Sequence, residues 1–197
     1  MESKFKEIDQ VIKFIIEIEK LKAIHRKTRP IGLNRYENSA EHSWHVCLSA
    51  LMLKEYANEN INIDHTIKML LIHDLGEIDA EDTIIYESET KEIKDKEEQG
   101  IKRILSILPK KQREIYLDLW FEFESGKTAE AKFARAVDRI PPLLHNLYGN
   151  GHSWKKHNIS SKQILSLNSR ISEGSAAVWG VIRAKLEKAF TNGILNK

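Results

Sequence analysis

The stretch DHTIKMLLIHDLGE, residues 64–77, joins a helical pattern to a pair of polar residues at its end. Ile67, Leu70 and Leu71 recur at three- and four-residue steps, which is the period of a helix with one apolar face. Asp64 is the predicted N-cap, and Gly76 suits the C-terminal turn. His73 and Asp74 therefore lie where this helix ends, and their side chains can converge on one point beyond its terminus.

The same helical period continues on both sides of this stretch, and no segment alternates with the period of two that is typical of a half-buried strand. Thr128 is the predicted cap of a segment that Pro141-Pro142 breaks or kinks. The other expected helices cover about 4–24, 40–57 with Ser39 as N-cap, 92–107, 110–124, and a long C-terminal segment over about 160–192 that starts at Ser160 or Ser161. The regions at about 80–91 and 149–160 resemble linkers. The expected fold class is all-α.

Length and composition narrow the class of protein. The chain has 197 residues, of which 41% are hydrophobic and 30% charged, so we expect one globular domain rather than a disordered chain. Lys and Arg number 31 against 29 Asp and Glu, a balance that argues against a dedicated binder of nucleic acid or of a membrane surface.

Three further features of the sequence bear on the cellular location of the protein. The longest apolar run, Met69 to Ile72, is far shorter than the roughly 20 residues of a membrane span. The N-terminus lacks the apolar core of a signal peptide. Cys47 is the only cysteine, which excludes an intrachain disulfide and a four-cysteine zinc site. A cytoplasmic location is the default expectation.

Three separated segments carry possible metal ligands. They are Glu41-His42-Ser43-Trp44-His45, His73-Asp74 and Asp138. A His-Asp pair arises often by chance, and the two side chains can simply hydrogen-bond each other. The pair alone therefore proves little.

The order of these motifs is more specific than any one of them. Ser39-Ala40-Glu41-His42-Ser43, Ile72-His73-Asp74-Leu75-Gly76-Glu77 and Val137-Asp138 resemble the signature of the HD-domain metal-dependent phosphohydrolases. The nearest likeness is to the YfbR-type 5'-deoxynucleotidases and their eukaryotic relatives, over about residues 15–148. The resemblance implies a single HD-domain helical bundle over residues 1–197, with a helical extension at about 160–192.

The resemblance also implies the cofactor. The expected ligands are His42, His73, Asp74 and Asp138 around one divalent cation, either Mn, Co, Fe, Ni, Zn or Mg. His45 is the alternative to His42, because residues three apart lie on one helix face. Relatives with two metals carry further histidines between the His-Asp pair and the last aspartate, and this chain has none from Leu75 to Val137.

Three other residues match functional positions of the family. Glu77 and Asp82 match catalytic carboxylates, and Arg26 matches an arginine that faces the substrate phosphate. The chain departs from the related deoxynucleotidases in two places. Glu81 stands where they usually carry glycine, and Lys27-Thr28-Arg29 replaces an aromatic residue just beyond the arginine. We therefore expect weaker discrimination between deoxyribose and ribose.

The expected activity is hydrolysis of (deoxy)nucleoside 5'-monophosphates, with attack by a metal-bound water. The alternatives are hydrolysis of another small phosphate ester, a catalytically weak HD module that senses a nucleotide, and a helical protein that a metal merely stabilises. The expected partner is the small nucleotide substrate, with neither nucleic acid nor membrane, and the family resemblance suggests a homodimer.

Overall fold

The computed structural model describes residues 2–82 and 90–195, and within these ranges all regular structure is helical. This confirms the all-α prediction. The one β-bridge among the described residues pairs His25 with Asn38. The helices are α1 (Glu2–Ile18), η1 (Glu19–Ala23), α2 (Ser39–Leu53), η2 (Lys54–Tyr56), α3 (Ile63–Ile72), α4 (Glu77–Ala80), α5 (Lys91–Leu105), α6 (Lys110–Ser125), α7 (Ala129–Asp138), α8 (Ile140–Tyr148), α9 (His152–Lys156), α10 (Ser161–Asn168), α11 (Ile171–Gly174) and α12 (Ala176–Thr191).

Helix starts follow side-chain capping, with two corrections to the predicted caps. Asn38, not Ser39, caps α2, in a capping box with Glu41. Asn62, not Asp64, caps α3 by accepting the His65 N–H. In both cases asparagine is the residue that adopts extended φ/ψ just before the first helical turn, which is what an N-cap requires. Thr128 caps α7 as predicted.

Helix ends differ from the predicted boundaries in two regions. The first helix ends at Ile18 and continues as a 3₁₀ turn. The predicted long C-terminal helix is divided into α10, α11 and α12. The break before α12 lies at Ser175, which is extended with φ −153° and caps that helix. The break at Pro141-Pro142 is confirmed, since both prolines lie in the first turn of α8. The predicted linker at 149–160 contains α9, and most of that at 80–91 lies outside the described residues.

The buried apolar side chains of the described residues form two clusters. One cluster joins α2, α3 and α7 to the C-terminal helices and includes Leu70, Val137 and Ile171. The other joins the end of α3 to α5 and α6 and includes Leu75 and Ile101. His73 and Asp74 therefore lie where the two clusters meet.

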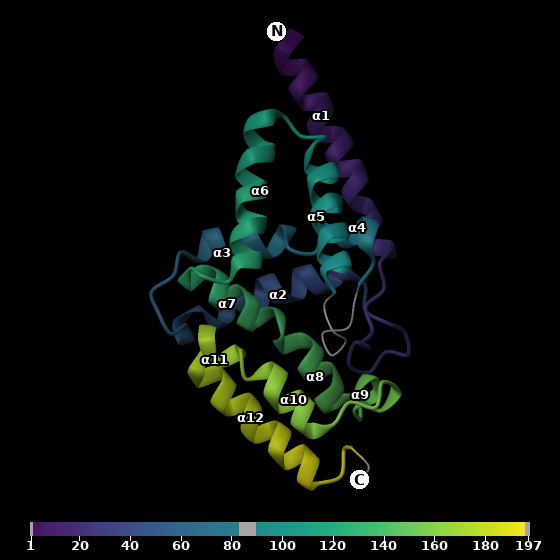
Figure 1. Ribbon diagram of the computed structural model, residues 1–197, viewed down its shortest axis with the longest axis vertical. Coiled ribbons are helices and arrows are strands. Elements are labelled where there is room, and N and C mark those ends of the chain that lie inside the picture. Colours follow the sequence, from purple (N-terminus) through teal and green to yellow (C-terminus); the bar gives the residue numbers. More distant parts are fainter. Residues whose placement is uncertain (1, 83–89, 196–197) are drawn as a thin grey trace.

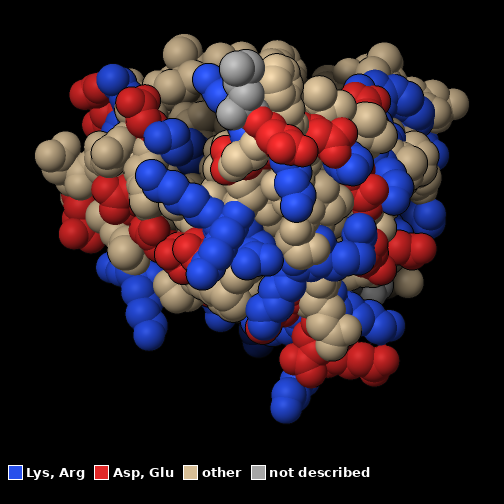
Figure 2. Space-filling model, turned by 90° about the horizontal axis from the view of Figure 1, so that it is seen from above, with Lys and Arg blue, Asp and Glu red and all other residues tan. Residues whose placement is uncertain are grey.

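The N-terminal end of α1 projects beyond the other helices, and the rest of α1 lies against α5 (Figure 1). No residue of α1 is fully buried, but Val11, Phe14 and Ile18 pack on the second cluster. The end of the molecule seen from above carries acidic and basic side chains interspersed with each other (Figure 2). None of the helices in the described parts is long and apolar enough to cross a membrane.

Two glycines allow α5 to touch the turn after α3. A Cβ on Gly76 would lie 2.7 Å from the Glu97 carbonyl oxygen, and one on Gly100 would lie 2.7 Å from the Gly76 carbonyl oxygen. Gly76 has φ −61°, which any residue can adopt. Gly76 lies in the turn after α3 as expected, but it does not adopt the left-handed conformation of a C-cap glycine, and its role is close backbone contact.

Candidate active site

Residues from separate parts of the chain meet in one place, which we call the central cluster. Arg26 comes from the loop after η1, His42 from the second turn of α2, and His73 and Asp74 from the end of α3. Glu77 starts α4, Asp82 follows it, and Asp138 is the last residue of α7. All seven predicted site residues belong to this cluster.

The histidines and Asp138 form its centre. One oxygen of Asp138, Oδ1, lies 2.8 Å from His42 Nε2 and 3.4 Å from His73 Nε2. One ligand atom from each of the three residues lies within 4.8 Å of the others. Asp74 joins this group, because its Oδ1 is 3.0 Å from His73 Nε2 and its Oδ2 is 3.9 Å from His42 Nε2. His45 is not among them.

The backbone fixes which nitrogen His73 presents. His73 Nδ1 donates a hydrogen bond to the Leu70 carbonyl oxygen over 2.7 Å, so the proton of the neutral ring is on Nδ1. Nε2 then carries the free lone pair, and this buried atom has no hydrogen-bond partner. The indole N–H of Trp120 donates to the His73 carbonyl oxygen over 3.2 Å. A metal would take the lone pair that is left, so the donor set fits a divalent ion.

Negative charge dominates the cluster. Burial alone lowers the pKa of His73, but the neighbouring carboxylates of Asp74 and Asp138 raise it to about 9. Burial raises the pKa of Asp138, yet its contacts with His42 and His73 hold that pKa well below its usual range. The protein environment therefore attracts positive charge to this point, as a cation site requires.

Arg26 lies directly beside the predicted ligands. Its Nη1 is 2.8 Å from Asp74 Oδ2 and 3.4 Å from Asp82 Oδ1, and its side chain is only 12% exposed. Burial lowers its pKa, but the carboxylates around it raise the pKa well above its ordinary value. The guanidinium is thus a permanent cation next to the candidate metal ligands, where a phosphate oxygen can replace a carboxylate contact.

The two matched carboxylates sit on the same side of the cluster. The Ser39 hydroxyl donates a 2.6 Å hydrogen bond to Glu77 Oε2. Burial, reinforced by neighbouring carboxylates, raises the pKa of Glu77 well above its usual range and that of Asp82 more modestly. Asp79, between them in sequence, instead pairs with Arg103, whose Nη2 is 2.9 Å from Asp79 Oδ1.

Glu81 holds the backbone just before Asp82 in an unusual conformation. Its φ and ψ are 66° and 160°, a region that side chains other than glycine rarely adopt. The family-level expectation of glycine at this position matches this backbone geometry. Glu81 therefore stores conformational strain beside the site.

Sequence reasoning missed Glu37 and His145 at the edge of the cluster. Glu37 is 2% exposed, and its Oε2 lies 3.5 Å from His42 Nδ1 and 3.7 Å from Arg26 Nε. Glu37, His45 and His145 offer a second group of ligand atoms within 4.8 Å of one another. Glu37 lies in a loop just before the Asn38 cap, so helical spacing gave no signal for it.

Comparisons with known proteins agree with this geometry. A family model described as HD domain matches residues 18–179. The 5'-deoxynucleotidase HDDC2 of Homo sapiens is 29% identical over 114 residues, covering 57% of this chain and 54% of that protein. The protein of the same name from Bos taurus is 30% identical over 115 residues, with the same coverage. The chain spans about half the length of the curated relatives it matches.

Solved structures extend the likeness over nearly the whole chain. A predicted metal-dependent phosphohydrolase from Magnetospirillum magnetotacticum is 39% identical, with a TM-score of 0.91 over 98% of this chain and 100% of that one. An HD-domain phosphohydrolase from Listeria innocua, 20% identical with a TM-score of 0.58 over 92% of this chain and 86% of that one, shares the fold. With the motifs, the central cluster and the family match over residues 18–179 together, this chain belongs to the HD domain family.

Proposed function

We propose that the chain is a metal-dependent phosphohydrolase that releases phosphate from nucleoside 5'-monophosphates. The observation that carries this proposal is the meeting of His42, His73 and Asp138 within 4.8 Å, with Arg26 beside them. The relatives named 5'-deoxynucleotidase support the substrate class.

Four side chains would hold one divalent ion: His42, His73, Asp74 and Asp138. Two imidazoles and two carboxylates suit Mn, Fe, Co, Ni, Zn or Mg. The bound ion would polarise a phosphate oxygen and make water a better nucleophile.

Arg26 would bind and orient the phosphate. Its planar guanidinium offers several donors in a fixed plane, which suits two oxygens of a terminal phosphate. Because its side chain is largely buried beside Asp74 and Asp82, it needs little reorganisation to meet a bound substrate.

Glu77 and Asp82 would move the protons. We assign Glu77, oriented by the Ser39 hydroxyl, to accept a proton from the attacking water. We assign Asp82 to donate a proton to the departing 5'-oxygen of the nucleoside, since Asp82 stands eight residues beyond Asp74 and Glu77 only three. A cation held by the ligands would lower the raised pKa of Glu77 and leave its carboxylate able to accept a proton. The P–O bond to the nucleoside breaks as the bond to water forms, and phosphate leaves.

The test is a phosphate-release screen over ribo- and deoxyribonucleoside 5'-monophosphates, each with Mg²⁺, Mn²⁺, Co²⁺ and Zn²⁺. We expect turnover of both sugar series with at least one metal and none after chelation. A nucleotide that binds without turnover under every metal would favour the sensor instead. A preference of many hundred-fold for one sugar would contradict the expected weak discrimination.

Four finer expectations stay predictions with their own measurements. Elemental analysis should give about one divalent ion per chain and identify it. Unfolding in one cooperative transition would support a single domain over residues 1–197. Light scattering tests the homodimer, and cell fractionation tests the cytoplasmic location.

A further inference from the structure

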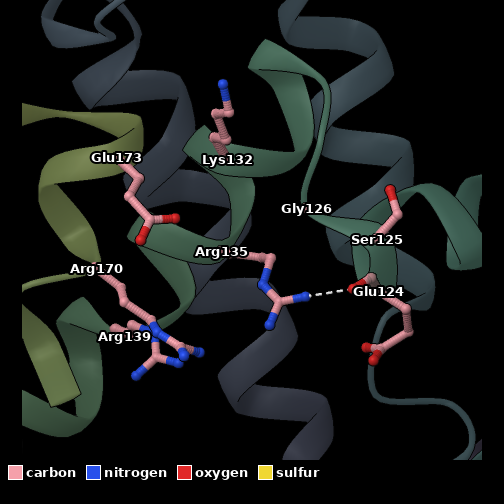
Figure 3. Close-up of a pocket in the computed structure, with 8 residues that line it drawn as sticks. All are labelled: Glu124, Ser125, Gly126, Lys132, Arg135, Arg139, Arg170 and Glu173. Carbon is pink, nitrogen blue, oxygen red and sulfur yellow. Dashed lines mark hydrogen bonds between the residues drawn. The ribbon is translucent and has the colours of Figure 1, made fainter.

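A charged hollow lies apart from the central cluster, where α6, α7 and α11 approach one another (Figure 3). Its volume is about 280 Å³. We call it the arginine pocket; it is lined by Glu124, Ser125, Gly126, Lys132, Arg135, Arg139, Arg170 and Glu173. Four of these side chains are cationic and two are anionic, so positive charge is in excess.

The cations come from two elements. Lys132 and Arg135 lie on α7 and Arg139 directly follows it, at positions i, i+3 and i+7 that share one face. Arg170 comes from the turn between α10 and α11. Arg139 and Arg170 both line the pocket, and their guanidinium groups overlap in the view of Figure 3.

Two of these cations, Arg135 and Arg170, lack a carboxylate partner among the described residues. Arg135 Nη1 donates to the carbonyl oxygens of Phe123 and Glu124 over 3.1 and 2.6 Å, at the C-terminal end of α6. Within residues 2–82 and 90–195, neither Arg135 nor Arg170 has a carboxylate oxygen within 4.0 Å. Lys132 has only a long contact, 3.8 Å to Glu59. Like charges gathered in a hollow repel each other unless an anion joins them.

Backbone packing holds the pocket in shape. A Cβ on Gly174 would lie 2.3 Å from the Lys132 carbonyl oxygen, so α11 rests directly on the backbone of α7. Gly126, with φ +60°, leaves room for the Arg135 stem, which a Cβ there would meet at 3.2 Å. The cations are thus positioned before any ligand arrives, which lowers the entropic cost of binding.

We propose that the arginine pocket binds the phosphate or diphosphate group of a small molecule, at a site separate from the central cluster. Guanidinium forks are the best match for phosphate oxygens. A volume of about 280 Å³ lies just below the usual range of about 300–1,000 Å³ for pockets that enclose a drug-sized ligand, so the pocket suits the anionic group and leaves any organic part outside.

The test is a calorimetric titration of the full chain with pyrophosphate. Arg170→Gln should weaken binding roughly tenfold or more, because it removes a charged and exposed donor from the pocket. Glu173→Gln should tighten binding several-fold, because it removes a repelling carboxylate. Arg183→Gln is the matched control, since it removes an exposed arginine from α12, outside the pocket, and should change nothing.

Pyrophosphate could also bind at the central cluster. The titration is therefore repeated in an Arg26→Ala background, which lacks the proposed phosphate contact of that cluster. Binding that persists there, and that Arg170→Gln still weakens, supports the proposal. Affinities unaffected by both Arg170→Gln and Glu173→Gln would overturn it, whatever the outcome of the phosphate-release screen.

Inorganic phosphate, tripolyphosphate and a nucleoside triphosphate distinguish the sources of the group. A triphosphate nucleotide that binds no tighter than tripolyphosphate means that the pocket recognises phosphates alone. Tighter binding of the nucleotide means that its organic part contacts the rim.

Discussion

The central cluster and the arginine pocket both use α7, with opposite charge. Asp138, at the end of this helix, contributes to a group in which carboxylates outnumber the one arginine. Arg139, the next residue, lines a hollow in which cations outnumber carboxylates. The C-terminal end of α7 thus contributes residues to two sites, one suited to a cation and the other to an anion.

An unbalanced group of charges has a different meaning where it is buried and where it is open to water. Charges removed from water are costly unless they are paired, so an unbalanced group marks a place where something charged is to bind. By that reasoning the buried central cluster takes a cation. The cations of the arginine pocket are half-buried or exposed, and there the proposal of an anion rests on the excess of positive charge in one hollow. Each of the following experiments alters one side of this comparison.

The largest effect is expected from Asp138→Ala. Removing this carboxylate takes away the oxygen shared by His42 and His73, so metal content and phosphate release should both fall to background. Elemental analysis and the release assay measure this. Asp118→Ala, an exposed position on α6, is the control. Pyrophosphate binding that also vanished in Asp138→Ala would mean that the two sites are one.

Arg26→Ala should lower kcat/KM by roughly 10²–10³-fold, because a charged phosphate contact is lost. Arg26→Lys keeps the charge and loses the planar fork, so it should recover only part of the deficit. Steady-state kinetics on a nucleoside monophosphate give the values. Unchanged kinetics in Arg26→Ala would remove Arg26 from the proposed substrate site.

The two carboxylates should separate by leaving group. Asp82→Asn should lose most of its deficit on p-nitrophenyl phosphate, whose leaving group needs no proton. Glu77→Gln should be impaired on this ester and on a nucleotide alike. If Asp82→Asn is equally slow on both substrates, the assignment of roles is wrong.

The smallest effect is expected from Glu81→Gly. Glycine adopts the backbone conformation of Glu81 without strain, whereas other residues lose on the order of 1–3 kcal/mol there. After the entropic cost of glycine, the free energy of unfolding should rise by about 1 kcal/mol. Urea denaturation measures it, and Glu81→Ala, which retains a Cβ, should show no gain.

Much of the fold and the meeting of the site residues could be predicted from sequence. Helical period and proline placed most helices of the described chain, and Thr128 was a correct cap because it directly precedes the apolar pattern. The wrong caps at Ser39 and Asp64 show the limit, since a neighbouring asparagine offers the same chemistry one or two residues earlier. The motifs named seven residues, and these lie together.

The features that could not be predicted from the sequence depend on contacts between segments that are distant in the chain. Glu37 reaches His42 from a loop that has no period. Arg170 lies in the turn between α10 and α11, where it lines the pocket together with residues of α7. The sequence predicted one continuous helix here, and therefore no turn at Arg170. Gly174, at the other end of α11, packs on the backbone of Lys132, about forty residues earlier in the chain, and helical period gives no sign of such a contact.

The paired glycines have a consequence for how this site tolerates change. Gly76 and Gly100 set the separation between α5 and the turn that carries Glu77, with carbonyl oxygens where side chains would otherwise stand. A methyl group at Gly100 would have to push that turn aside, and the Ser39–Glu77 hydrogen bond with it. Gly100 contacts neither the predicted metal ligands nor Arg26. A substitution at Gly100 should nevertheless cause the same loss of function as a substitution of His73 or Asp74.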